Sequence, residues 1–466
     1  MAKRSAKLSV FITVILVLVL AGGCFLLFQD RDAPVITISH TVEEISPNLP
    51  ITVTIIDATS PIKRVNVVAR HQENEIPVVS QTFDDDSREQ SLTFTLAGAG
   101  LKNDTAFDLE ITAVDASFGG FGFGNKGKLI APMRLDATPP RISIKTSTPY
   151  VRRGGSSVIV YSIAKEVQQT GVKVNDYFFP AFRQENGDFL CFFAFPYYLE
   201  VNDFNPQLVA LDRAGNLSVS NLPVNRINRQ FRQDTINITQ SFLNSQAAEF
   251  EAMVPGQMND IDRFLIINRQ IRRENALTLL EIGKDTAPHI LWAGAFMRLP
   301  RAAPRAGFAD HRDFIFEGQV IDQQLHLGLD LASVRQAPIP AANSGTVVYA
   351  DYLGIYGNMV VIDHGLGLQS LYSHLSEIGV DVGQRVDRGD IIGRTGTTGM
   401  AAGDHLHFGI LLSGLEVTPL EWLDSNWIRN NVVDRIQNAG FPLPEFKIEA
   451  VEPPPANTRP AQGARR

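Results

Sequence analysis

The sequence predicts a mainly β protein built from several domains. Most of the chain after residue 30 consists of short β-branched and aromatic runs separated by Gly, Pro, Asn and Asp, the pattern of strands and turns. Residues 235–292 instead show apolar positions at helical spacing. With 466 residues, 44% hydrophobic and 20% charged, the chain is long enough for about three globular domains. We therefore expect two β-sandwiches, a short helical segment and a C-terminal antiparallel β domain.

The chain begins with an uncharged, mostly aliphatic run at residues 8–28. As a helix, this run could cross the roughly 30 Å hydrocarbon core of a bilayer. Lys3, Arg4 and Lys7 precede it, and such cationic flanks stay in the cytoplasm. We therefore expect a single-pass anchor in the cytoplasmic (inner) membrane, with all later domains periplasmic or otherwise extracytoplasmic. A cleaved signal peptide and a lipoprotein signal ending at Cys24 are the alternatives.

Charge and cysteine content exclude some classes of protein. A formal net charge of −8 leaves no basic excess to neutralise phosphates, so we expect no nucleic-acid partner. The chain has two cysteines, Cys24 and Cys191. If Cys24 lies in the membrane, a disulfide framework is not possible.

A weak internal repeat predicts the two sandwiches. Asp32–Ile38 and Asp136–Ile144 are both extended, Pro-containing segments that lead into a strand. The strand ends Ile111–Ala116 and Leu208–Asn216 also resemble each other. Both units resemble bacterial immunoglobulin-like domains, and fibronectin-like sandwiches fit equally well. We expect them to be spacers, with contact to envelope protein partners as the alternative.

The helical segment is expected to contain two or three helices, with Asp260 as an N-cap and Gly283 as a stop. It is either a linker or a cap laid over the next domain. The expected boundaries are 1–31 for the cytoplasmic residues and anchor, 32–135 and 136–234 for the sandwiches, 235–299 for the helical segment, 300–430 for the C-terminal β domain, and 431–466 for a partly disordered tail.

Six of the nine histidines fall between His311 and His407, in a segment of short strands and Gly-rich turns. In the sequence from His326 to Asp330, apolar residues alternate with polar or small ones, so an extended backbone would put both side chains on one face. The two imidazoles of His405 and His407 would likewise share a face. These two segments can supply two nitrogens and one carboxylate oxygen to one metal.

Two nitrogens and one carboxylate, with a fourth position left for water, are the ligand set of a catalytic zinc site. Zinc lowers the pKa of such a water towards about 7 and polarises a carbonyl. A base or charge stabiliser is also needed beside the metal. His405 and His374, which ends a strand-like run, are the candidates. His364 and His311 are interpreted as structural residues.

The same residues resemble a known family. The motifs His326-x-x-x-Asp330, Tyr372-x-His374 and His405-Leu406-His407-Phe408 are similar to those of the LytM, or lysostaphin-type, zinc metallopeptidases of peptidase family M23. The likeness covers residues 310–425 and includes the strand-like segments around Val347 and Ile362. It implies an antiparallel β domain of the duplicated hybrid motif type.

The resemblance implies that His326, Asp330 and His407 bind one Zn²⁺ and that His374 and His405 are catalytic. It further implies that Asn358 shapes the substrate groove. Two departures are visible, Asp404 where the family often has Pro and Gly409 where Glu is frequent, and neither is a ligand position.

The function implied is hydrolysis of peptide bonds in the cross-links or stems of bacterial peptidoglycan. The expected protein is therefore a membrane-anchored peptidoglycan endopeptidase. The main alternative is a non-catalytic LytM-type regulator that activates another cell-wall hydrolase, and retention of all five site residues favours the enzyme.

Overall fold

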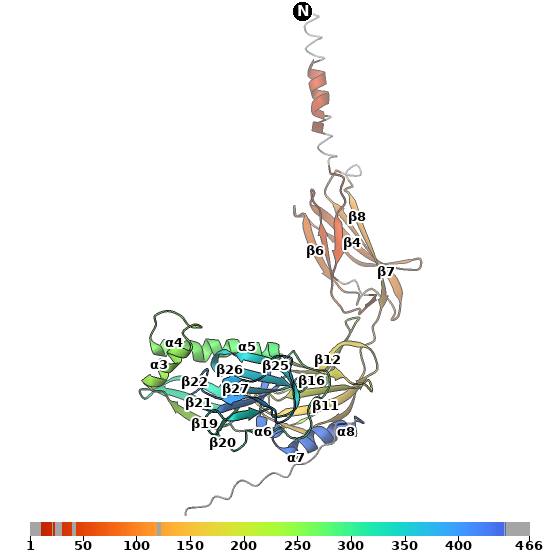
Figure 1. Cartoon of the computed structure of the whole chain (residues 1–466). Helices are drawn as coiled ribbons and strands as arrows, with labels where there is room; N and C mark the ends of the chain where they lie inside the picture. The colour runs from red at the N-terminus through yellow and green to blue at the C-terminus, as the bar shows by residue number, and fades with distance from the viewer. Residues whose placement is uncertain are drawn as a thin grey trace, which may run out of the picture. The chain divides into compact units, whose positions relative to one another are not determined.

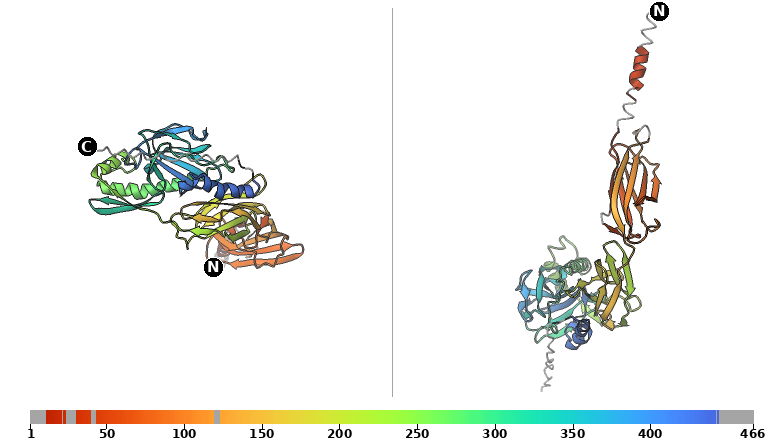
Figure 2. Two further views of the ribbon diagram at one scale, coloured as in Figure 1. Left: turned by 90° about the horizontal axis from the view of Figure 1, so that it is seen from below. Right: turned by 90° about the vertical axis from the view of Figure 1, so that its right-hand side faces the viewer.

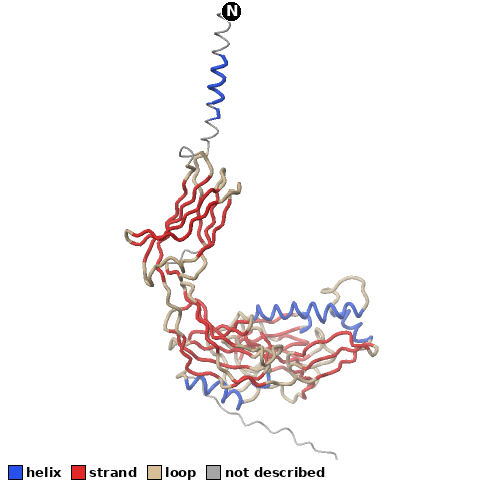
Figure 3. The backbone as a smooth tube through the Cα atoms, turned by 180° about the vertical axis from the view of Figure 1, so that it is seen from behind, coloured by secondary structure: helices blue, strands red, loops and turns tan. Residues whose placement is uncertain are grey.

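The computed structural model describes residues 11–20, 22–23, 30–39, 43–118, 123–441 and 443. The chain forms two compact units, which are residues 1–141 with 164–169 and 210–218, and residues 142–163 with 170–209 and 219–466. Strands are the main regular structure of both units (Figures 1 and 3). The predicted mainly β fold class is therefore confirmed.

Residues 11–20 and 22–23 are helical, and every side chain of 11–20 is exposed. The rest of the predicted anchor at 8–28, including Cys24, lies outside the described residues. Within the part of the chain that the structure describes, no helix combines the length and the hydropathy that a membrane span requires.

The first unit is built around a sandwich of a three-stranded sheet, in the order β1-β3-β6, and a five-stranded sheet, in the order β2-β8-β7-β4-β5. Alternate side chains of β3, those of Ile51, Val53 and Ile55, are completely buried between the sheets. The strands are β1 (Val35–Ile38), β2 (Glu44–Ile45), β3 (Ile51–Ile56), β4 (Ile62–His71), β5 (Asn74–Thr82), β6 (Glu89–Phe94), β7 (Ala106–Asp115) and β8 (Lys126–Leu135).

A second sandwich pairs the sheets β14-β15-β11-β9 and β13-β12-β16-β17, with a parallel pair β10-β18 at its side. Most of it belongs to the second unit, whereas residues 164–169 and 210–218, which include the start of β12 and the end of β16, belong to the first. The strands are β9 (Ile142–Ser147), β10 (Tyr150–Arg152), β11 (Ser156–Ile163), β12 (Val167–Val174), β13 (Tyr177–Pro180), β14 (Phe182–Arg183), β15 (Phe189–Ala194), β16 (Pro206–Asp212), β17 (Leu217–Asn221) and β18 (Asn225–Ile227).

The C-terminal domain contains a ten-stranded sheet with the path β20-β23-β30-β27-β26-β25-β28, joined at its sides by β24, β29 and β31. Beside it lies a three-stranded sheet, β19-β21-β22. The strands are β19 (Gln233–Asn237), β20 (Ala303–Ala306), β21 (Asp310–Phe316), β22 (Gln319–His326), β23 (Leu329–Ala332), β24 (Pro338–Pro340), β25 (Gly345–Tyr352), β26 (Asn358–Asp363), β27 (Leu368–Ile378), β28 (Arg385–Val386), β29 (Ile391–Thr395), β30 (Leu406–Leu412) and β31 (Leu415–Val417).

Helices lie in two stretches of the second unit. The first, α3 (Gln240–Glu249), α4 (Asp260–Ile266), the π-helical turn η1 (Ile267–Ile271) and α5 (Arg272–Ile282), precedes the ten-stranded sheet. The second, α6 (Pro419–Trp422), α7 (Ser425–Ile428), the π-helical turn η3 (Arg429–Val433) and α8 (Asp434–Asn438), follows it. A 3₁₀ turn, η2 (Gly354–Tyr356), connects β25 to β26.

The first helical stretch covers one face of the ten-stranded sheet (Figures 1 and 2). Leu279 of α5 and Ile267 of η1 share a buried cluster with Met359 of β26, Leu371 of β27 and Leu411 of β30. Burial of such side chains contributes roughly 1.5–3 kcal/mol each. The helices are therefore packed against the C-terminal domain.

The ends of these helices correct one detail of the sequence analysis. Asn259, not Asp260, is the N-cap of α4, because its side chain accepts the backbone N–H of Asp262. Gly283 caps the C-terminus of α5, as predicted.

Trp422 joins the second sandwich to the C-terminal domain within the second unit. Its ring lies 5.7 Å from that of Phe192 in β15, and its Nε1–H donates to Ser156 Oγ of β11 at 3.0 Å. This contact explains why all six residues of β15 are buried, since one side of the strand faces the sandwich interior and the other meets the C-terminal domain. The second sandwich therefore packs against the C-terminal domain through α6.

We expect Trp422→Ala to lower the free energy of unfolding of the second unit by about 3–5 kcal/mol, because it empties a completely buried site and leaves Ser156 without its donor. Leu420→Ala, in the same helix but 47% exposed, should change it by less than about 0.5 kcal/mol. Urea denaturation of both variants measures the difference. Equal effects would mean that this aromatic contact does not hold the sandwich in place.

Candidate functional site

His326, Asp330 and His407 converge at the point where three strands meet. β22 ends at His326, and the antiparallel pairing of β23 with β30 puts Asp330 directly opposite His407. His326 Nε2 lies 2.8 Å from Asp330 Oδ1 and 3.0 Å from His407 Nδ1, and these last two atoms are 3.0 Å apart. All three side chains are buried, and together they could hold a metal ion.

The segment from His326 to Asp330 is not one extended strand, so that part of the prediction is wrong. β22 and β23 belong to different sheets, and the chain bends at Leu327 and Gly328 between them. A Cβ at Gly328 would lie 2.5 Å from His407 Nε2. The bend therefore needs glycine at residue 328. His326 and Asp330 meet because of this bend, and not because they alternate along one strand.

Hydrogen bonding makes this cluster a fit for a cation. His326 Nδ1 lies 2.7 Å from the Gly307 carbonyl oxygen, which can only accept, so the ring proton is assigned to Nδ1. His326 Nε2 then presents a lone pair to the oxygen of Asp330 and to Nδ1 of His407. His326 Nε2 and Asp330 Oδ1, two acceptor atoms 2.8 Å apart, repel each other in a buried site unless a cation lies beside them. Two imidazole nitrogens and one carboxylate oxygen are donors that suit zinc.

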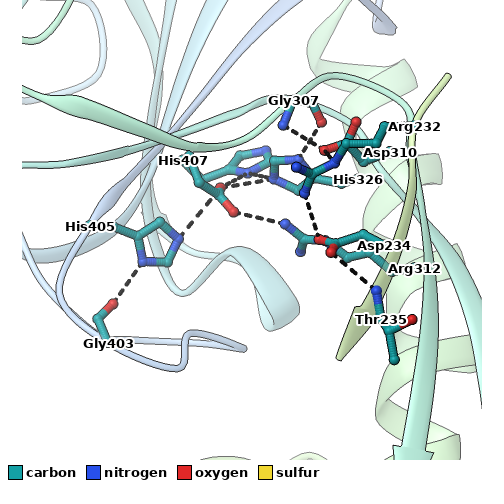
Figure 4. A network of polar contacts seen from close by, with 11 residues as sticks. Arg232, Asp234, Thr235, Gly307, Asp310, Arg312, His326, Gly403, His405 and His407 are labelled. Carbon is teal, nitrogen blue, oxygen red and sulfur yellow. Dashed lines mark hydrogen bonds and ion pairs between the residues drawn. The ribbon is translucent and has the colours of Figure 1, made fainter. Parts of the chain in front are cut away.

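The sequence analysis did not identify Arg312, which contacts this cluster from β21. Its Nη2 donates to Asp330 Oδ2 at 2.9 Å, so the two oxygens of that carboxylate have different partners. Figure 4 shows Arg312 and His405 near His326 and His407, and each contacts Asp330. The β21–β22 hairpin, which turns at Glu317 and Gly318, places Arg312 opposite Gln324. The two-residue turn is visible in the sequence, and the hairpin register that follows from it could have predicted that Arg312 lies near the end of β22.

His374 and His405 lie beside the three convergent residues, with ring centroids 4.8 Å apart. His374 Nδ1 is 2.9 Å from the Thr398 carbonyl oxygen, and His405 Nδ1 is 2.7 Å from that of Gly403. Both carbonyls accept a proton-bearing nitrogen, so Nε2 of each ring is the atom left for chemistry. His405 Nε2 lies 3.5 Å from Asp330 Oδ1. The structure therefore brings all five predicted residues together.

His374 has a left-handed backbone, with φ of +63°, inside the long strand β27. Non-glycine residues rarely adopt this conformation, and it costs roughly 1–3 kcal/mol. The pairing of β27 with β26 shifts register at this point, between Tyr372 and Leu375. The strained residue breaks the alternation of side chains, so its imidazole position could not follow from strand periodicity.

Burial and neighbouring charges shift the pKa values of the histidines and the aspartate in this cluster. Burial and the neighbouring imidazoles lower the pKa of His374 well below its usual value, and burial lowers that of His407 to about 4. Burial opposes ionisation of Asp330, but its histidine neighbours outweigh this and hold its pKa well below the usual range. For His405, the Asp330 carboxylate outweighs burial and raises the pKa. The cluster thus favours an ionised carboxylate and a neutral His374.

Asn358, expected in the substrate groove, lies in β26 next to the histidines. Its backbone N–H donates to Thr398 Oγ1 at 3.0 Å, and its side-chain amide donates to the Leu375 carbonyl at 3.1 Å. Asn358 thus contacts Leu375, which follows His374, and Thr398, whose carbonyl oxygen accepts from His374 Nδ1. His364 is buried and bonded to Ser344 and Ser370, in keeping with its structural interpretation.

A cavity of about 560 Å³ opens beside Arg312, with four arginines in its wall. Arg269 pairs with Asp322 and Arg272 bonds Asn268, whereas Arg273 has no partner in the described part of the chain. The lining residues are Tyr197, Gln233, Arg269, Arg272, Arg273, Ala276, His311, Arg312, Asp313, Gln323, Gln324, Leu325 and Leu327. The cavity is therefore cationic and lies next to the histidine cluster.

Comparison with known proteins identifies the region around this cluster. Residues 324–419 match the model of peptidase family M23. The chain is 37% identical over 97 residues to the DD-carboxypeptidase/endopeptidase Mpg of Neisseria meningitidis, covering 21% of this chain and 22% of that protein. It is 38% identical over 96 residues to the peptidoglycan DD-endopeptidase ShyA of Vibrio cholerae, with 21% and 22% covered.

Among solved structures, a zinc-containing peptidase from Vibrio cholerae is similar, with 16% identity, a TM-score of 0.25, and coverage of 68% of this chain and 80% of that one. The sequence matches span only about a fifth of the two curated relatives. The matched segment contains all five residues of the cluster. Residues 324–419 are therefore a peptidase family M23 domain, as the sequence resemblance predicted.

Proposed function

We propose that this protein is a zinc metalloendopeptidase that hydrolyses peptide bonds in peptidoglycan, either in cross-links or in stem peptides. The observation that carries the proposal is the convergence of His326, Asp330 and His407 with two further imidazoles aimed at the same point. The M23 match and the peptidoglycan endopeptidase named among the relatives support the reaction class.

His326, Asp330 and His407 would hold the zinc ion. Bound there, zinc supplies a Lewis acid that activates water and polarises a scissile carbonyl. His374, neutral and with its Nδ1 proton held by a carbonyl, can accept the proton of the attacking water at Nε2. His405 can donate a hydrogen bond to the oxygen that becomes negative as the carbonyl is attacked.

The cationic cavity supports an anionic substrate. Arg273 has no partner among the described residues, and Arg312 connects the cavity wall to Asp330. Guanidinium groups bind carboxylates well because their donors match both oxygens. Peptides with several free carboxylates, such as the stems of peptidoglycan, fit this wall better than neutral peptides do.

A location outside the cytoplasm fits this substrate. The apolar run at residues 8–28 follows three cations, and Leu18 and Val19 in its described part are 65% and 68% exposed. We propose that this run anchors the chain in the inner membrane, so that the M23 domain works in the cell envelope.

A non-catalytic regulator of another wall hydrolase is the second candidate. The helices α3 to α5 favour it most, because they cover the face of the sheet to which His407 and Leu411 both point. Such a cover is compatible with a domain that binds a partner without cleaving a substrate. The retained cluster of five residues favours the enzyme.

We expect purified chain to contain one zinc ion per M23 domain and Gly328→Ala to lose most of it. The added Cβ would collide with His407 Nε2 and displace a proposed ligand. Gly409→Ala, two residues from the same histidine, has an ordinary 3.5 Å contact and should keep its zinc. Elemental analysis of both variants decides. Full zinc occupancy in Gly328→Ala would contradict the proposed ligand geometry.

Incubation of the chain with isolated sacculi should release wall peptides, and a zinc chelator should stop the release. We expect His374→Ala to lower the rate by about 10²–10⁴-fold while keeping its zinc content, because it removes the proposed proton acceptor. Chromatography of soluble fragments measures the rate. No release by the wild-type chain would favour the regulator, and undiminished release by His374→Ala would exclude the proposed mechanism.

Arg273→Gln should raise KM for soluble muropeptides with free carboxylates by about tenfold, or about 1.4 kcal/mol, and change kcat little. For the same peptides with amidated carboxylates, the KM of the variant should equal that of the wild type. Lys284→Gln, at the exposed end of the same helical stretch, is the matched control. An unchanged KM for both substrates would show that the cavity does not bind the stem.

A further inference from the structure

A second group of metal-ligating side chains lies in the first unit, away from the M23 domain. Asp30, Asp57 and Asp115 each offer one carboxylate oxygen, and these oxygens lie within 4.8 Å of one another. Asp57 and Asp115 are 4% and 0% exposed. Within the described part of the chain, no lysine, arginine or histidine pairs with any of the three. Three carboxylates so arranged need a positive charge among them.

One oxygen of this cluster has no donor. Asp57 Oδ1 accepts the N–H groups of Thr59 and Ser60 at 2.9 and 2.8 Å, but the buried Asp57 Oδ2 has no hydrogen-bond partner in the described residues. An ionised oxygen that is removed from water without a partner is strongly unfavourable. Its position therefore indicates a ligand that the chain itself does not supply.

The second sandwich contains the same arrangement with its own cation. Asn216 Nδ2 donates to the Asp136 carbonyl at 2.9 Å and to Asp212 Oδ2 at 3.0 Å. Between these two aspartates lies Lys165, whose Nζ donates to the carboxylates of both, at 2.5 Å to Asp212 Oδ2. Lys165 follows β11, the strand that pairs with the first strand of its sandwich.

The first sandwich reproduces this network without the lysine. Asn125 Nδ2 donates to the Asp30 carbonyl at 3.4 Å and to Asp115 Oδ2 at 3.0 Å, as Asn216 does in the second sandwich. After β3, the counterpart of β11, the chain has Asp57 in place of an ammonium group. The first sandwich thus has the carboxylate of Asp57 where the second sandwich has the ammonium group of Lys165.

We propose that Asp30, Asp57 and Asp115 bind a calcium ion. All the ligand atoms are oxygens, which suits a hard cation and not zinc or copper. Calcium takes six to eight oxygen ligands at about 2.3–2.6 Å in flexible geometry, so three carboxylates whose oxygens lie within 4.8 Å of one another can share one ion. Magnesium demands near-ideal octahedral geometry at about 2.0–2.1 Å and usually keeps several waters, so three gathered carboxylates suit it less well.

Calcium at this site would connect three separate segments. Asp30 follows the apolar run directly, Asp57 follows β3 and Asp115 ends β7. The ion would therefore fasten the segment that leaves the apolar run to the body of the first sandwich. Calcium modules that work outside cells bind with Kd values of about 10⁻⁴–10⁻³ M, and we expect a value in this range.

The test is calorimetric titration of the full-length, zinc-loaded chain in detergent with calcium chloride, followed by thermal unfolding with and without calcium. We expect one binding event and a higher unfolding midpoint of the first sandwich. Asp57→Asn should weaken binding by at least about tenfold. Asp86→Asn, an exposed acidic residue of the same sandwich, should bind as wild type does.

Asp30→Asn is a second variant that does not threaten folding, because Asp30 lies before the first strand and is only partly buried. It should also lose calcium affinity while retaining zinc content. The proposal is overturned if wild type shows no calcium binding, or if Asp57→Asn and Asp30→Asn both bind calcium as tightly as wild type. An equal response to magnesium would overturn the assignment to calcium.

Discussion

The pairing of β23, β30 and β27 is the constraint on which the candidate site depends. Its register puts Asp330 opposite His407, and His407 opposite Ser373, so that the next residue, His374, follows immediately at the break in β27. A slip of one residue would turn His407 to the other face of the sheet. Long-range hydrogen bonding, more than any local segment, therefore determines which side chains can share a metal.

The surroundings of the site hold this register in place. Carbonyl groups of Gly307, Thr398 and Gly403 orient the three rings, which are those of His326, His374 and His405. Such outer contacts fix the tautomer and position of metal-site histidines. The second sandwich supports the same sheet from outside through Trp422 and its contact with Ser156. The M23 domain is thus embedded in the second unit.

The two sandwiches share a pattern of asparagine–aspartate hydrogen bonds but differ in the charges of the side chains around it. In the second sandwich, Lys165 neutralises Asp136 and Asp212 within the chain. In the first, three aspartates gather with no such residue among those described, so their charge balance depends on the solution. The two sandwiches therefore share this hydrogen bonding but differ in electrostatics.

The sequence by itself determined the mainly β class, the strands that carry the motifs, and the M23 resemblance. The strand-like segments around Val347 and Ile362 form β25 and β26, because alternating or continuous apolar runs between Gly-rich turns indicate strands. The five candidate residues were also identified from their motifs, since metal ligands have few chemical substitutes.

Only the tertiary structure decided how these residues meet. The bend at Gly328, the left-handed His374 and the contact of Arg312 with Asp330 all arise from pairing between distant strands. The packing of the second sandwich against the C-terminal domain depends likewise on contacts such as that of Phe192 with Trp422. Periodicity reports which face of a strand is apolar, but not which other element covers it, because that choice is made by shape and by hydrogen bonding across the whole unit.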